Sequence, residues 1–99
     1  MGQPIDPNLQ AAEDAKNEAL HVLATAKTFD ELKEGVTKVY ESRRPRHGHE
    51  AAQLLNFIEI RDPTKIVDVP IERVREALAR IAAGNPADSR PAEYLKLLG

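Results

Sequence analysis

The residues best suited to chemistry lie in one short polar stretch. His47, His49 and Glu50 stand within four positions of one another, and His21 supplies a third imidazole earlier in the chain. Imidazole and carboxylate groups are ligands that transition metals accept. Two histidines one residue apart are equally typical of solvated side chains beside a helix start. We therefore assign no metal and no cofactor, and keep a metal-dependent regulator as the third and weakest hypothesis.

The same stretch begins with three arginines, Arg43, Arg44 and Arg46. Guanidinium groups present planar sets of donors that bind phosphates and carboxylates. Only Tyr40 is nearby to stack on a base, so the pattern is also that of a solvated loop. This cluster supports an alternative function, in which the chain binds anions or nucleic acid.

Several catalytic chemistries are excluded by what the chain lacks. It has no cysteine, so it forms no disulfide, Cys-ligated zinc site or catalytic thiol. It also lacks the sequence signatures of serine hydrolases, phosphate-binding loops, dinucleotide folds and zinc proteases. Neighbouring carboxylates such as Glu13 and Asp14 fall at expected helix starts or outer faces, where they complement the helix dipole. We predict that the protein is not an enzyme.

Composition and charge set the class of protein. The 99 residues are 41% hydrophobic and 30% charged, which is typical of one soluble globular domain spanning residues 1–99. No apolar run approaches the ~20 residues of a membrane span, and no secretion signal is recognised at the start. We therefore expect a cytoplasmic protein without a membrane partner, and a disordered segment over residues 1–5. The net charge of −2 argues against a dedicated nucleic-acid binder.

The charge is unevenly distributed along the chain. Residues 1–42 carry eight acids against four lysines, a net charge of −4, and residues 43–99 carry eight acids against ten bases, a net charge of +2. Such asymmetry can mark a polar binding face. It is also a common by-product of which helix faces are exposed to water.

Proline, glycine and capping residues divide the chain into amphipathic segments. Pro7 suits a first helical position, and Thr28 with Glu31 forms a capping box that starts the next helix. The apolar residues between these breaks recur at helical spacing. The expected fold class is all-α, a compact bundle of four to five helices. Their expected limits are about 7–26, 29–42, 49–61, 70–83 and 90–98.

Three local features carry further expectations. Gly35 lies inside the second helix, at a cost of about 1 kcal/mol relative to alanine, and indicates a close contact or simple tolerance. Residues 65–69 are β-branched in composition, yet they have no pairing partner, so we expect an extended linker rather than a strand. Gly84 is expected to stop the fourth helix as a left-handed residue.

The apolar faces of the third and fifth helices indicate the function. Residues 49–61 are apolar over more than one stripe, which is typical of a central helix or of one covered by a partner. We predict a small protein–protein interaction or adaptor domain that binds another protein or a second copy. Its partner-binding residues would be Phe57, Ile60, Tyr94 and Leu98. The basic loop would steer an acidic partner. The alternative for Phe57 is that it fills the core.

Overall fold

The computed structural model describes residues 7–43 and 46–99 and consists of five α-helices and one 3₁₀ turn. The helices are α1 (Pro7–Thr25), α2 (Phe29–Arg43), α3 (His49–Ile60), α4 (Ile71–Gly84) and α5 (Arg90–Leu98), with η1 (Pro63–Lys65) between α3 and α4. The predicted all-α class is confirmed, and every predicted helix limit agrees within one residue. The expected disorder over residues 1–5 and the residue Arg44 lie outside the described residues.

The capping residues act largely as the sequence predicts. The backbone N–H of Glu31 donates to the Thr28 hydroxyl at 3.0 Å, which satisfies one of the free donors at the start of α2. The Thr28 hydroxyl in turn donates to the Glu31 carboxylate at 3.3 Å. In a complete capping box the Glu31 carboxylate accepts the backbone N–H of Thr28. Here it accepts the Thr28 hydroxyl instead.

The end of α4 corrects one prediction. Gly84 is the last residue of the helix, and its backbone does not adopt the left-handed conformation expected of it. Asn85 ends the helix instead, with its side-chain amide donating to the Ile81 carbonyl at 2.9 Å and to the Lys27 carbonyl at 2.7 Å. The helix therefore stops where a side chain from outside it satisfies a free carbonyl.

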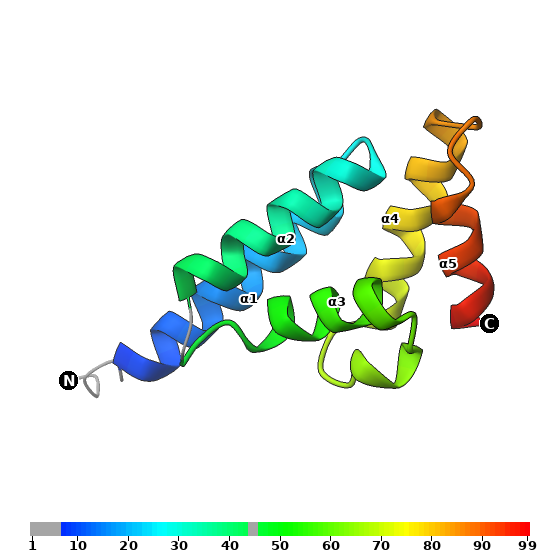
Figure 1. The fold of residues 1–99 in the computed structure, drawn as a ribbon. Helices are drawn as coiled ribbons and strands as arrows, with labels where there is room; N and C mark the ends of the chain where they lie inside the picture. Colours follow the sequence, from blue (N-terminus) through cyan, green and yellow to red (C-terminus); the bar gives the residue numbers. More distant parts are fainter. Residues whose placement is uncertain (1–6, 44–45) are drawn as a thin grey trace.

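Two antiparallel helix pairs form the ends of the molecule. Figure 1 shows α1 beside α2 at one end and α4 beside α5 at the other. Helix α3 packs on both α1 and α2, and α4 also contacts α1. Alanines line the buried side of α1 and the turn after it, and Ala15, Ala19 and Ala26 are almost fully buried. These small side chains allow the neighbouring helices to pack closely.

An aromatic cluster joins the two ends. The Tyr94 ring of α5 lies 5.1 Å from the Phe29 ring of α2 and 5.4 Å from the Phe57 ring of α3, measured between centroids. The Tyr94 hydroxyl donates to the Ile58 carbonyl within the core. All three rings are buried, and the aliphatic core surrounds them. The cluster therefore connects α5 to α2 and to α3.

The segment between α3 and α4 is a linker that is anchored to the core. No strand occurs among the described residues, and residues 66–69 follow the short turn η1, which ends at Lys65. Asp62 caps this turn, because its carboxylate accepts the Thr64 backbone N–H at 2.9 Å. Ile66 and Val69 are buried. These β-branched residues thus anchor a linker to the core and do not form a strand.

Within residues 7–43 and 46–99, none of the helices is both long enough and apolar enough to cross a bilayer.

Gly35 makes the close contact that the sequence indicated. A Cβ atom at this position would lie 2.8 Å from Cγ1 of Val22, across the α1–α2 interface. Gly35→Ala adds about 1 kcal/mol of helix propensity and also creates this clash. We expect the substitution to raise the free energy of unfolding by about 1 kcal/mol in a Val22→Ala background and by clearly less when Val22 is present. Urea unfolding followed by circular dichroism measures the difference, and equal gains in both backgrounds would contradict the close contact.

Candidate functional site

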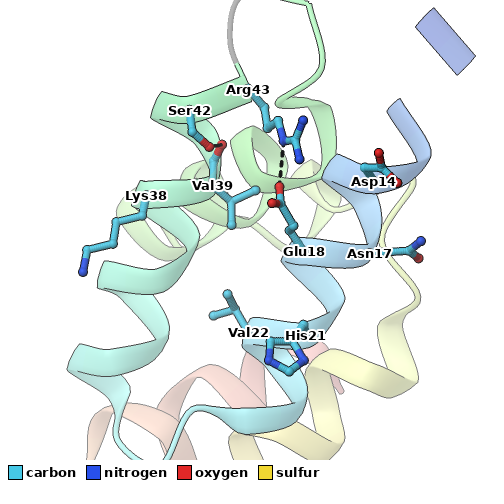
Figure 2. A pocket seen from close by; sticks show the side chains of 9 residues that line it. All are labelled: Asp14, Asn17, Glu18, His21, Val22, Lys38, Val39, Ser42 and Arg43. Carbon is cyan, nitrogen blue, oxygen red and sulfur yellow. Dashed lines mark hydrogen bonds and ion pairs between the residues drawn. The ribbon is translucent and has the colours of Figure 1, made fainter. Parts of the chain in front are cut away.

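The structure has an open groove of about 720 Å³ between α1 and α2. Val22 of α1 and Val39 of α2 form its apolar floor, and Figure 2 shows both pointing into the space between the helices. Asp14 and Glu18 from α1 and Lys38 from α2 lie around the edge. Antiparallel packing brings the middle of α1 beside the end of α2, so residues distant in sequence share this surface.

An ion pair closes one end of the groove. The Arg43 Nε atom donates to Glu18 Oε2 at 2.7 Å (Figure 2). This hydrogen bond is the main reason that the pKa of Glu18 lies below its usual value and that of Arg43 lies above it. The Glu18 side chain remains 46% exposed, so solvent screens the pair. The pair links the middle of α1 to the end of α2.

A second, smaller hollow continues the groove toward the α1–α2 turn. Both hollows share Val22 and Lys38, and the second is also lined by Ala26, Glu34 and Gly35. Lys38 pairs with Glu34 one turn earlier on α2, with 3.1 Å between its Nζ atom and the carboxylate. The whole groove lies along the hairpin, and every residue that lines it belongs to α1 or α2 or to the turn between them.

Of the predicted arginine cluster, Arg43 and Arg46 are described by the structure, and their surroundings differ. Arg43 is the last residue of α2 and is committed to Glu18. Arg46 is exposed in the loop after α2, and Arg44 lies outside the described residues. The structure thus uses one of the predicted anion-binding residues as a link between helices.

The predicted partner-binding residues divide into buried and exposed. Phe57, Tyr94 and Leu98 are only 1%, 5% and 7% exposed and belong to the core. This part of the predicted surface is wrong, because the faces that carry these side chains pack against other helices of the same chain. The alternative interpretation of Phe57 as a core residue is confirmed. Ile60 is 56% exposed and remains available.

The exposed large apolar side chains of the described residues include Ile60 at the end of α3, Ile71 at the start of α4 and Leu97 near the end of α5, and we call these three the apolar end. Ile60 ends α3, and the next residue, Arg61, places its guanidinium 5.5 Å from the centroid of the Tyr94 ring. On the other side, Arg75 of α4 donates to the Leu98 carbonyl at 2.9 Å. The end of α3, the start of α4 and the end of α5 therefore meet here (Figure 1).

Sequence reasoning missed Ile71 and Leu97 as surface residues. Each is 39% exposed, although each belongs to an amphipathic helix. For α5, the leucine-rich stretch Leu95-Lys96-Leu97-Leu98 does not show which leucine faces inward. The Phe29 and Phe57 rings that receive Tyr94 settle this, because they fix the rotation of α5. No local sequence signal contains that information.

The histidines have separate surroundings. His21 lines the α1–α2 groove, whereas the His49 ring bonds to the Asp68 carboxylate on the linker before α4. Gln53 reinforces this contact, because its side-chain oxygen accepts the Asp68 backbone N–H at 2.9 Å. Across residues 7–43 and 46–99, no three His, Asp or Glu side chains lie close enough together to hold a metal ion. The contact ties the linker to the first turns of α3.

The core position of Phe57 can be tested by truncation. Phe57→Ala removes a ring that is almost fully buried and leaves a cavity, so we expect the free energy of unfolding to fall by about 3–5 kcal/mol. Ile60→Ala, at the exposed end of the same helix, should change it by roughly 0.5 kcal/mol or less. Urea unfolding of both variants gives the comparison. Equal, small losses would contradict the packing of α3.

The Glu18–Arg43 pair predicts a pH dependence. Since the pKa of Glu18 is lower in the folded than in the unfolded protein, ionised Glu18 stabilises the fold at neutral pH. This contribution is lost as the pH falls through the folded pKa. We expect Glu18→Gln to lower the urea midpoint at pH 7 and to have less effect below pH of about 4. Glu41→Gln, at an exposed position outside the groove, is the control, and an equal, pH-independent effect of both would refute the pair's role.

Comparisons with known proteins identify no relative. No family model, no curated protein and no solved structure matches the chain. A functional assignment therefore depends on the geometry of the groove and of the apolar end.

Proposed function

We propose that the protein is a small, non-enzymatic helical domain that binds another protein through the apolar end. The observation that carries this proposal is the exposure of Ile60, Ile71 and Leu97 at the end of α3, the start of α4 and the end of α5. Solvent-exposed apolar groups that gather on one part of a soluble protein are typical of interaction sites. The proposed surface still includes α3 and α5, as predicted. Its residues are exposed ones, in place of the buried Phe57, Tyr94 and Leu98.

The expected interaction is modest in strength. Full burial of a large aliphatic side chain contributes about 1.5–3 kcal/mol, and the three side chains are already partly covered. Their combined contribution is therefore a few kcal/mol, before the cost of association. This fits a transient complex, or one that recruits further contacts from the surrounding polar surface.

The ionisation of the polar groups supports the non-enzymatic part of the proposal. A general acid or base works best when its pKa lies near the working pH. The pKa values of Glu18 and Asp68 are instead lowered, mainly by hydrogen bonds from Arg43 and His49 respectively, and thus move away from neutrality. Both carboxylates serve as hydrogen-bond partners that hold segments of the chain together.

Anion or nucleic-acid binding remains the alternative hypothesis, with less support. Its predicted residues include Arg43, whose guanidinium already bonds to Glu18. Arg46 is exposed and can still take part in such binding.

Substitutions at the apolar end test the proposed function. Ile60→Asp combined with Leu97→Asp places two charges on the surface, and we expect at least a tenfold loss of partner binding. Leu9→Asp is the matched control, because Leu9 is 70% exposed on the first turns of α1, far from this end. Affinity capture from the source cells and light scattering of the purified protein measure the two classes of partner. Circular dichroism verifies that each variant folds.

Each outcome of this experiment is informative. A self-association that only the double variant abolishes identifies a second copy as the partner. A captured protein that only the double variant loses identifies a different chain. Binding that survives in the double variant, or a monomer that captures nothing, would refute the proposal.

A further inference from the structure

The α1–α2 groove is a second surface, distinct from the apolar end. Helices α3 and α4 pack on the hairpin elsewhere, yet they contribute no residue to the groove. Val22 is only partly buried, and Gly35 beside it has no side chain to fill the space. The hairpin thus has an open side with a narrow apolar floor. A further helix lying along two antiparallel helices would complete a three-helix arrangement there.

The dimensions of the groove define the length of its occupant. Its lining residues on α1 run from Asp14 to Thr25, and at 1.5 Å per residue this is about 16 Å, or three helical turns. The apolar side chains of the lining, Val22, Ala26 and Val39, are few and are accompanied by polar ones. Such a small apolar area suits a helix with one apolar stripe, with residues spaced three and four positions apart.

The charge of the groove defines the sign of its occupant. Four carboxylates line it, namely Asp14 and Glu18 near one end and Glu31 and Glu34 near the other. The two strong bases of the lining, Lys38 and Arg43, are each paired with one of these acids. An excess of two negative charges remains, and it includes a carboxylate at each end.

This excess also decides between a second copy and another protein. A symmetric dimer formed through the groove would place its acidic lining against an identical acidic lining, and like charges that face each other destabilise a complex. A helix with basic residues at both ends meets the opposite charge at each end. Charge complementarity therefore favours a basic partner.

We propose that the α1–α2 groove binds an amphipathic helix of a partner protein that carries lysine or arginine at both ends of a three-turn apolar stripe. This proposal is independent of the proposed function, because it concerns different residues on a different part of the surface.

Binding of designed peptides to the whole protein tests the proposal. The probe is a fluorescent, alanine-rich peptide of about 14 residues, with leucines three and four positions apart and two lysines at each end. Its counterpart has glutamates in place of the lysines. We expect saturable binding of the basic peptide with a dissociation constant below about 1 mM, and no saturable binding of the acidic peptide. Amide chemical shifts should change along α1 and α2 rather than at the apolar end.

Matched variants then separate the groove from general electrostatic attraction. Asp14→Asn with Glu31→Gln removes one carboxylate from each end, and the glutamine keeps an oxygen that can accept the Thr28 hydroxyl. We expect about fivefold weaker binding of the basic peptide. Glu13→Gln with Glu41→Gln removes the same charge from exposed positions of the same helices outside the groove, and should leave the affinity within about twofold.

Four results would overturn the proposal: no saturable binding of the basic peptide, equal binding of the acidic peptide, equal weakening by both variant pairs, or shift changes outside the hairpin. A dimer whose interface maps to the groove would equally overturn it. None of these results depends on Ile60 or Leu97, so the outcome is separate from that of the apolar end.

Discussion

The packing of Tyr94 between Phe29 and Phe57 is the constraint on which the rest of the structure depends. Helix α5 packs mainly on α4, and this aromatic contact connects the α4–α5 pair to α2 and α3. The rings are tilted or perpendicular to each other, which is the favoured geometry of aromatic pairs. Because the Tyr94 hydroxyl also bonds to the Ile58 carbonyl, the contact fixes both the position and the rotation of α5. The exposure of Leu97 and the burial of Leu98 follow from that rotation.

The same contact explains why the predicted interaction residues were partly misplaced. The chain has only four aromatic residues, and the fold uses three of them to join its two ends. A helix that is apolar on several sides indicates either a central position or a covered surface, and α3 takes the central position for Phe57. Its last residue, Ile60, extends past the packed region and stays exposed. Thus one helix supplies a core residue and a surface residue three positions apart.

The helix limits could be predicted because their causes are local. The Thr28 side chain accepts the backbone N–H of Glu31 at the start of α2, and Pro91 stands in the first turn of α5, where its fixed φ suits a helix. The groove could not be predicted, since it depends on contacts between distant residues. Glu18 and Arg43 are 25 positions apart, and the Arg80 guanidinium reaches the Leu23 and Ala26 carbonyls 57 and 54 positions away. Spacing along a helix contains no information about such partners.

These long-range contacts also account for the uneven charge of the sequence. Three arginines of residues 43–99 bind groups of residues 1–42. Arg43 pairs with Glu18, and Arg90 pairs with Asp30 at 3.1 Å. Arg80 donates hydrogen bonds to carbonyls at the negative end of α1. Part of the charge asymmetry is therefore an attraction between parts of one fold. Arg80 and Arg90 act at the turn end of the hairpin, on the side where α4 and α5 approach it. Neither Arg80 nor Arg90 pairs with a carboxylate of the groove. The α1–α2 groove therefore keeps its excess of negative charge.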